Sequence, residues 1–266
     1  SQALKGAEGI VIGATDTHKT LETLATVWKG LSDGKASRRS LMINLGGGMV
    51  TDLGGFAAAT FKRGIDFINV PTTLLAMVDA AVGGKTGINF NGLKNEIGAF
   101  KEARSVVVDT EFLRTLDDEN LRSGYAEMLK HSLLENAEMW ADHMKFDLDQ
   151  PDYAHLQELV KQSIDCKSRI VTEDPHEHGI RKALNLGHTV GHAFESLALE
   201  QGRPILHGYA VAYGLLCELY LSAMHSHFPT QQMQQTVRFI RDNYGAFQFT
   251  CDDYPHLYDL MLHDKK

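Results

Sequence analysis

The sequence predicts an α/β region with a parallel sheet over residues 1–112, followed by an all-helical region over residues 113–266. Two observations indicate this division. Before about residue 110, short β-rich runs alternate with glycine-rich turns and helical stretches, which is typical of a parallel sheet. After Asp109, glycine becomes sparse and apolar residues recur at helical spacing. We therefore place the boundary near residues 110–115.

The individual elements follow from local patterns. The β-rich runs predict strands over residues 40–45, 67–70 and 105–108. The spacing of apolar residues predicts helices over residues 116–144, 153–171, 185–199, 207–224 and 229–243. The apolar run 208–224 approaches the ~20 residues that a membrane span needs, but Glu218 interrupts it. We therefore expect a buried core helix there and no membrane association.

The composition is that of a globular protein, with 43% hydrophobic, 23% charged and 8% aromatic residues. Asp and Glu number 34 against 26 Lys and Arg, and this formal charge of -8 argues against nucleic acid as a partner. Cys166, Cys217 and Cys251 form no C-x-x-C pair, so neither a disulfide framework nor a thiolate zinc site is expected. The first residues lack the features of a signal peptide, and we expect a cytoplasmic protein.

A glycine-rich loop follows the first predicted strand. Gly46 and Gly48 fit the first two positions of the dinucleotide fingerprint G-x-G-x-x-G, but Thr51 stands at the third. The loop either lets a ligand approach the backbone closely or forms a tight strand-to-helix turn with no ligand.

A second glycine turn, over residues 82–86, is similar to a phosphate loop. Asp79 stands where that motif requires glycine, so the turn is not a nucleoside triphosphatase motif. It presents Lys85, with Lys94 and Asn95 soon after. These residues are either anion ligands or solvated surface side chains.

Two histidines share one face of the helix predicted over residues 185–199. His188 and His192 are four residues apart, so both imidazoles can reach one metal ion, although histidines at this spacing are often only packed or exposed. The zincin motif H-E-x-x-H does not match, because Thr189 stands at the glutamate position. His207 opens the next apolar helix beside a glycine and is a third candidate ligand.

Glu127 lies in an apolar helical turn, with Lys130 on the same face. An unpaired buried glutamate is costly, so we expect either a metal ion or an ion pair with Lys130. Two histidines and one carboxylate give zinc three protein ligands and an open position, as in catalytic sites, where the metal polarises an alcohol or carbonyl oxygen. Lys130, Lys167 and Arg181 add local positive charge and indicate an anionic substrate.

Seven blocks of sequence carry a resemblance that extends over nearly the whole chain. They are residues 45–52, 61–64, 70–85, 94–95, 123–130, 185–195 and 206–208. The stretch from PTTLL to GGKT and the run LNLGHTVGHAFE are the longest and most specific. In order and content these blocks closely resemble the 3-dehydroquinate synthase family of the sugar phosphate cyclases. The resemblance implies a Rossmann-like NAD-binding domain over residues 1–112 and an all-α zinc and substrate domain over residues 113–266.

The resemblance also implies an activity. The family comprises NAD- and zinc-dependent lyases that convert 3-deoxy-D-arabino-heptulosonate 7-phosphate to 3-dehydroquinate and phosphate, the second step of the shikimate pathway to chorismate and aromatic amino acids. NAD transiently oxidises a ring alcohol held by the metal, phosphate leaves by β-elimination, and reduction, ring opening and aldol cyclisation follow. Cobalt is an alternative metal, because the same ligands accept it. A homodimer with a small anionic sugar phosphate as substrate is implied.

Matching the motifs assigns a role to each site residue. The metal ligands fall on Glu127, His188 and His207. The catalytic positions are Lys85, Asn95, Lys130, Lys167 and His192. The substrate-binding positions are Arg63, which reaches the site of a neighbouring subunit, and Asp79, Lys94, Arg181 and Asn185. The NAD-binding positions are Asp16, Lys19, Gly47, Gly48, Asp52, Thr72 and Thr73.

The family pattern extends past both ends of the sequence. Family members usually carry another strand and helix before the Asp16 block, and a segment after the run Asp264-Lys265-Lys266, of which one lysine usually meets substrate. Three alternatives remain. They are a cyclase of another sugar, such as 2-deoxy-scyllo-inosose synthase or a valiolone-forming synthase, a metal-dependent alcohol or glycerol dehydrogenase, and a non-catalytic remnant. Among the cyclases, dehydroquinate synthase is favoured by Lys167, Arg181, Asn185 and the run Asp264-Lys265-Lys266. The intact metal ligands argue against a remnant.

Overall fold

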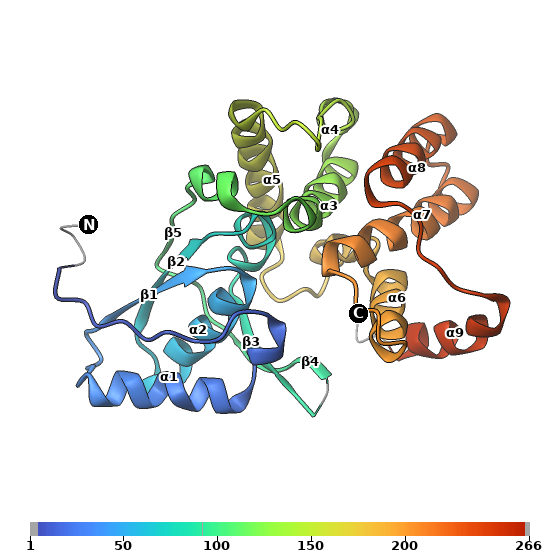
Figure 1. The fold of residues 1–266 in the computed structure, drawn as a ribbon. Helices are drawn as coiled ribbons and strands as arrows, with labels where there is room; N and C mark the ends of the chain where they lie inside the picture. The colour runs from blue at the N-terminus through green and yellow to red at the C-terminus, as the bar shows by residue number, and fades with distance from the viewer. Residues whose placement is uncertain (1–4, 92, 264–266) are drawn as a thin grey trace. The chain divides into compact units, whose positions relative to one another are not determined.

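The structure, a computed structural model, describes residues 5–91 and 93–263. It forms two compact units, one of residues 1–72 with 80–109 and one of residues 73–79 with 110–266. We call them the α/β unit and the helical unit. A parallel sheet in the first and helices in the second confirm the predicted fold class (Figure 1). The lysine expected to meet substrate within residues 264–266 lies outside the described residues.

A three-stranded parallel sheet forms the centre of the α/β unit. Its order is β1 (Leu41–Gly46), β2 (Asp66–Pro71) and β5 (Ser105–Val106). Helix α2 (Gly48–Thr60) packs against β1 and β2, and α1 (Leu21–Asp33) packs against α2. The buried apolar residues of this unit include Leu24, Val27, Leu53, Phe56, Ala57, Ala58, Ile65, Phe67 and Ile88. The three predicted strands are thus confirmed, with β5 two residues shorter than expected.

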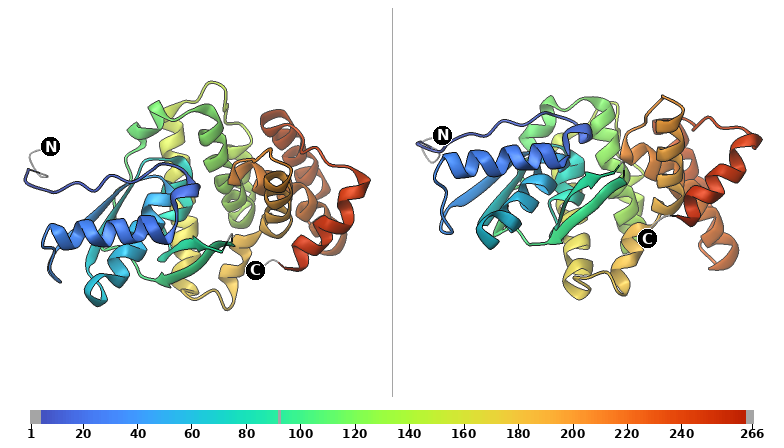
Figure 2. Two further views of the ribbon diagram at one scale, coloured as in Figure 1. Left: turned by 60° about the horizontal axis from the view of Figure 1, so that its bottom comes forward. Right: turned by 90° about the horizontal axis from the view of Figure 1, so that it is seen from below.

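An antiparallel hairpin that the sequence pattern did not predict completes the unit. Strands β3 (Lys85–Phe90) and β4 (Leu93–Phe100) pair with each other and not with the parallel sheet, and Figure 2 shows them in green as a separate ribbon. Gly87 and Gly98 lie opposite each other, and a Cβ on Gly98 would come within 2.2 Å of Thr86 O. Glycine has a low strand propensity, which is why the sequence pattern did not predict these strands. The same two glycines allow the strands to approach each other closely.

Seven helices make up most of the helical unit. They are α3 (Asp118–Glu135), α4 (Ala137–His143), α5 (Tyr153–Glu173), α6 (His188–Glu200), α7 (His207–His225), α8 (Thr230–Tyr244) and α9 (Tyr254–Leu262). The core of the unit gathers apolar side chains of α3, α6, α7, α8 and α9. No helix in residues 5–91 and 93–263 is long and apolar enough to cross a membrane.

The helices differ from the sequence prediction at three places. The single helix expected over residues 116–144 is wrong, because Asn136 is extended and its side chain accepts from the N–H of Met139, which starts a new helix. The helix expected from residue 185 begins at His188, because Gly187 is left-handed with φ 81°. Helix α9 was not predicted.

Acid is expected to destabilise this unit through His143. The ring is fully buried, its Nδ1–H donates to Met139 O at 2.8 Å, and burial lowers its pKa from 6.5 to about 4. Because the folded state binds this proton less readily than the unfolded chain, the penalty is absent above about pH 6.5. It grows as the pH falls toward about 4, by at most about 1.4 kcal/mol per pH unit. Urea unfolding of the wild type and of His143→Gln between about pH 7 and 5 measures the effect, and equal slopes would contradict it.

Candidate active site

Helix α3 carries two charged residues on a fully buried face. Asp117 fixes the start of the helix by accepting from the backbone N–H of Asn120 at 2.8 Å. Glu127 is 0% and Lys130 1% exposed, and the Lys130 ammonium forms an ion pair with Glu127 Oε2. Glu127 Oε1 is buried and has no hydrogen-bond partner among the described residues. Such a carboxylate oxygen is costly unless a cation meets it.

Two histidines face this oxygen. His188 is the first residue of α6 and His207 the first of α7, and each Nε2 lies 3.5 Å from Glu127 Oε1. Their Nδ1 atoms lie 3.3 Å from Leu186 O and 3.4 Å from Glu195 Oε2, respectively. Contacts of this kind fix the tautomer and orient Nε2 toward a metal ion. One carboxylate and two imidazoles are ligands that zinc takes, so the predicted set fits a metal ion.

His192 adds a third imidazole, one helical turn after His188. The centroid of its ring lies 5.4 Å from that of His188 and 5.7 Å from that of His207, and one nitrogen of each of the three rings lies within 4.8 Å of the others. Two donor sets therefore share His188 and His207, one completed by Glu127 and the other by His192. Glu195 was missed, although its place seven residues after His188, on the same helical face, is a signal for it.

Opposite charges control the protonation of this cluster. Burial favours a protonated Glu127, but the positive charges of Lys130 and the two histidines hold the pKa of its carboxyl well below the ordinary value. At His207, burial opposes the charged form, yet the carboxylates of Glu127 and Glu195 raise the pKa to about 9. The cluster therefore stabilises positive charge beside an ionised carboxylate.

A second ion pair, which is partly buried, lies in the same unit. Asp79 belongs to a π-helical turn over Ala76–Ala80, and Lys167 of α5 donates to its Oδ1 at 2.6 Å and to its backbone oxygen at 2.5 Å. Burial favours the neutral acid, but the charge of Lys167 outweighs it and lowers the pKa of Asp79. Burial lowers the pKa of the Lys167 ammonium, and the ion pair with Asp79 opposes this effect.

Arg181 and Asn185 lie in a 3₁₀ segment, Ile180–Asn185, just before α6. Arg181 is 3% exposed and donates to Pro175 O at 2.6 Å. Asn185 Nδ2 donates to Glu177 Oε1 at 2.7 Å. Glu177, which the sequence analysis did not select, therefore holds a predicted substrate-binding side chain.

In the α/β unit, predicted residues converge on the ammonium of Lys19. This residue is 4% exposed and donates to Asp52 Oδ2 and to Asn95 Oδ1, each at 2.5 Å. Asn89 links the cluster to Asp16, because its Nδ2 donates to Asp16 Oδ2 at 3.1 Å and its Oδ1 accepts from the Asn95 N–H at 3.0 Å. Asn89 was missed because it lies in the hairpin that the sequence did not predict.

The predicted glycines lie at the carboxyl ends of the strands. Gly47 is the N-cap of α2 and Gly48 its first residue, directly after β1. Thr72 follows β2, and its N–H donates to Gly46 O at 3.0 Å. Backbone N–H groups at such a helix start suit a pyrophosphate, and the carboxyl ends of parallel strands are where dinucleotides bind.

The other predicted positions are distributed over both units. Lys94 Nζ lies 3.7 Å from Asp16 Oδ2, and Lys85 is the exposed first residue of β3. Arg63 is exposed in a turn with φ 69° after α2, a left-handed backbone that is unusual outside glycine. Thr73 belongs to the helical unit, where its hydroxyl accepts from the N–H of Ala76 at 3.2 Å.

Glycine lets the two histidine-bearing helices cross at close range. A Cβ on Gly214 of α7 would come within 2.0 Å of Gly187 O and 2.7 Å of Gly191 N, at the start of α6. No rotamer relieves a contact with backbone. The close crossing therefore fixes the position of His188 relative to α7.

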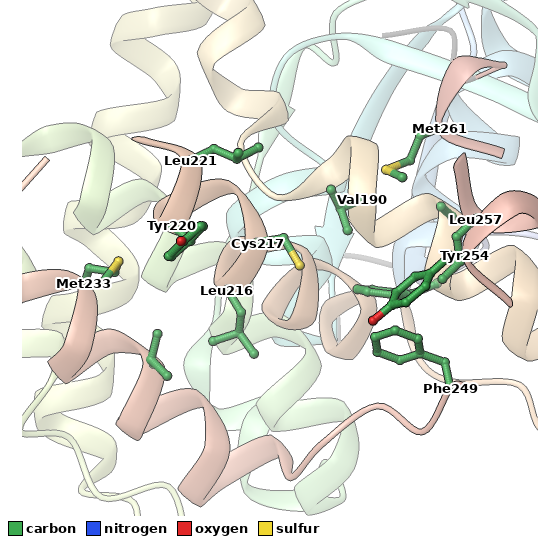
Figure 3. Close-up of a pocket in the computed structure, with 13 residues that line it drawn as sticks. Val190, Leu216, Cys217, Tyr220, Leu221, Met233, Phe249, Tyr254, Leu257 and Met261 are labelled. Atoms are coloured by element: carbon green, nitrogen blue, oxygen red, sulfur yellow. The ribbon is translucent and has the colours of Figure 1, made fainter. Parts of the chain in front are cut away.

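The helical unit also contains an apolar hollow of about 620 Å³ that holds none of the predicted site residues (Figure 3). Its lining comes from α6, α7, α8, α9 and the segment before α9, and includes Val190, Phe194, Tyr220, Met233 and Tyr254. Without charged side chains in its wall, it does not suit an anionic substrate.

The fold and the site together define a metal-dependent enzyme, with a parallel-sheet unit and a helical unit that carries a Glu-His-His set. The chain matches the family described as 3-dehydroquinate synthase N-terminal over residues 9–123, and the one described as 3-dehydroquinate synthase C-terminal over residues 124–266. It is 58% identical to the 3-dehydroquinate synthase of Parabacteroides distasonis, over 99% of this chain and 75% of that protein. The chain therefore belongs to the 3-dehydroquinate synthase family.

Solved structures of other sugar phosphate cyclases share the fold. A 2-deoxy-scyllo-inosose synthase complexed with carbaglucose-6-phosphate, NAD⁺ and Co²⁺ is 27% identical, with a TM-score of 0.82 over 95% of this chain and 70% of that chain. The 2-epi-5-epi-valiolone synthase of Streptomyces hygroscopicus, with NAD⁺ and Zn²⁺ bound, is 28% identical, with a TM-score of 0.80 over 95% of this chain and 72% of that chain. These lower identities place the chain with the dehydroquinate synthases rather than with these two cyclases.

Proposed function

We propose that this chain converts 3-deoxy-D-arabino-heptulosonate 7-phosphate to 3-dehydroquinate and phosphate, as an NAD- and metal-dependent lyase of the shikimate pathway. The observation that carries the proposal is the buried Glu127 Oε1. It has no hydrogen-bond partner in the part of the chain that the structure describes, and the imidazole Nε2 atoms of His188 and His207 each lie 3.5 Å from it. We place the protein in the cytoplasm, in keeping with its three cysteines, all within the described residues and none in a disulfide.

Glu127, His188 and His207 would hold the metal, zinc or cobalt. The bound metal would supply polarisation of an alcohol oxygen of the substrate, and bound NAD would supply hydride-transfer chemistry. Lys130 keeps Glu127 ionised and oriented through its ion pair. His192, beside the two ligand histidines, faces the substrate.

The charged residues of the helical unit bind and orient the anionic substrate. Lys130 and Lys167 supply positive charge, and Asp79 holds the Lys167 ammonium in place. Arg181 and Asn185 contact substrate from the segment before α6. Fixed charges of this kind stabilise developing negative charge, such as that of departing phosphate, at little reorganisation cost.

The α/β unit supplies the cofactor site and further substrate contacts. The NAD-binding residues are Asp16, Lys19, Gly47, Gly48, Asp52 and Thr72, with Thr73 beyond β2. Lys85, Lys94 and Asn95 contact substrate, and the bond from Lys19 to Asn95 couples the two sets. We propose that residues 1–112 form the NAD-binding domain and that residues 113–266 form the metal- and substrate-binding domain.

Release of inorganic phosphate from the seven-carbon substrate tests the activity. With NAD and zinc present, we expect release that stops on chelation and no lasting accumulation of NADH. Steady NADH accumulation with simple polyols would instead indicate a dehydrogenase. Binding of zinc and NAD without release would indicate a cyclase of another sugar or a non-catalytic protein.

We propose a homodimer in which Arg63 of each subunit contributes to the active site of its partner. Two inactive variants are then expected to restore activity when their subunits are mixed. Arg63→Ala and His188→Ala are each expected to be inactive. When the two are mixed equally and exchange subunits, half of the dimers are hybrids with one competent site, so about a quarter of the wild-type activity returns. A mixture as inactive as its components, with exchange verified by mass, would contradict the shared site.

A further inference from the structure

Glu218 is a carboxylate in the middle of α7, a helix that is otherwise rich in apolar residues. It lies on the face of α7 that meets α6, because Val211, Gly214 and Leu215 precede it by seven, four and three residues, and all three pack against the start of α6. Its side chain is half-buried there. A charge at this place in a helix interface requires a polar partner.

Its partners are backbone N–H groups at the start of α6. Glu218 Oε2 accepts from the N–H of Gly187 at 2.7 Å, and Oε1 lies 3.4 Å from the N of Val190. A helix start leaves such donors without partners inside the helix, and Gly187 at the N-cap position has no side chain to satisfy them. A carboxylate also interacts favourably with the positive end of the helix dipole. Glu218 therefore caps α6 from a neighbouring helix.

Two residues lie between the capped positions, Thr189 and the candidate ligand His188. Its Nδ1 contacts Leu186 O, the carbonyl directly before Gly187, and its Nε2 faces Glu127 Oε1. The backbone on both sides of His188 is thus held by the carboxylate of Glu218, which lies 31 positions after Gly187 in the chain. A shift at Gly187 moves the imidazole away from the oxygen that it faces.

We propose that Glu218 is a positioning residue for the metal site: by holding the N–H groups of Gly187 and Val190, it sets His188 at binding distance from the metal that His207 and Glu127 share. This inference rests on the proposed function, which makes His188 a ligand. Residues that orient metal ligands typically contribute 10–100-fold to metal affinity. The sequence alone showed only a charge that interrupted an apolar run.

Metal affinity in the full chain tests the proposal without any assay of turnover. Zinc dissociation constants are measured by competition with a chromogenic chelator for the wild type, Glu218→Ala and Glu218→Gln, and the cobalt-substituted forms give a ligand-field spectrum. Glu218→Ala is expected to bind zinc about 10–100-fold more weakly and to alter the cobalt spectrum. Glu218→Gln, which keeps one acceptor oxygen, is expected to fall between the alanine variant and the wild type.

Asp152→Ala is the matched control. Asp152 caps α5 by accepting from the N–H groups of Ala154 and His155, so its loss also removes two bonds at a helix start. We expect a melting temperature lower by about 2–4 °C, as for a typical cap, with an unchanged zinc constant.

The outcomes separate the two proposals. Equal zinc constants for the wild type and Glu218→Ala, or equal weakening in Glu218→Ala and Asp152→Ala, would overturn the positioning role and leave Glu218 a structural cap. If Glu218→Ala does not fold, Glu218→Gln decides, because an unchanged constant and cobalt spectrum would overturn the role. Failure of the wild type to bind zinc would instead overturn the metal site of the proposed function.

Discussion

Glu127→Leu is expected to abolish high-affinity zinc binding and phosphate release, and to lower the free energy of unfolding by about 3–5 kcal/mol. The first effect follows because the variant lacks the only carboxylate proposed as a ligand. The second follows because Lys130, 1% exposed, is left with a buried charge and without its ion-pair partner. Chelator competition, phosphate release and urea unfolding measure the three quantities.

A double variant separates the two effects. Glu127→Leu with Lys130→Met replaces the buried ion pair by apolar side chains of similar size, which is often neutral or stabilising. We therefore expect stability near that of the wild type, with zinc binding still at least about 100-fold weaker. Zinc binding at the wild-type level in the double variant would show that the three histidines hold the metal without Glu127.

Gly214→Ala is expected to be a strongly damaging single-methyl change in the helical unit. The new Cβ would lie 2.0 Å from Gly187 O, so α6 and α7 have to separate. We expect a loss of about 3 kcal/mol in the free energy of unfolding, even though alanine favours a helix over glycine by about 1 kcal/mol. His188 moves with α6, so zinc binding is expected to weaken as well.

Gly9→Ala serves as the control for Gly214→Ala. A Cβ on Gly9 meets nothing within 4 Å, and its φ is not in the left-handed region, so we expect stability within about 0.5 kcal/mol of the wild type. Thermal unfolding of both variants gives the comparison. A Gly214→Ala protein with the stability and zinc affinity of the wild type would show that the helices tolerate a wider crossing.

Local patterns predicted much of the fold and of the site. Helical spacing was enough for α5, α7 and α8, whose ends lie within about two residues of the prediction. Motif resemblance selected Glu127, His188 and His207, and the structure brings the three together. His188 and His192 could be placed on one face from the sequence, because residues four apart in any α-helix lie on the same face.

Other features depended on contacts between distant residues. The hairpin of β3 and β4 was not predicted because glycines lower strand propensity. In the folded hairpin the glycines are favourable, because a side chain at Gly87 or Gly98 would collide with the opposite strand. Asn89 and Glu195 were missed for a related reason: each acts through a partner that only the fold supplies, Asn95 for the first and His207 for the second.

By itself, the sequence determined the order of a parallel-sheet region and a helical region, and the residue types at the candidate site, because periodicity and short motifs are local properties. Only the tertiary structure decided which oxygen of Glu127 lacks a hydrogen-bond partner among the described residues, which imidazole nitrogens face it, and why Glu218 stands in an apolar helix. Those facts depend on how α3, α6 and α7 cross. The free energy of a buried charge is set by its neighbours in space, and the linear sequence does not give them.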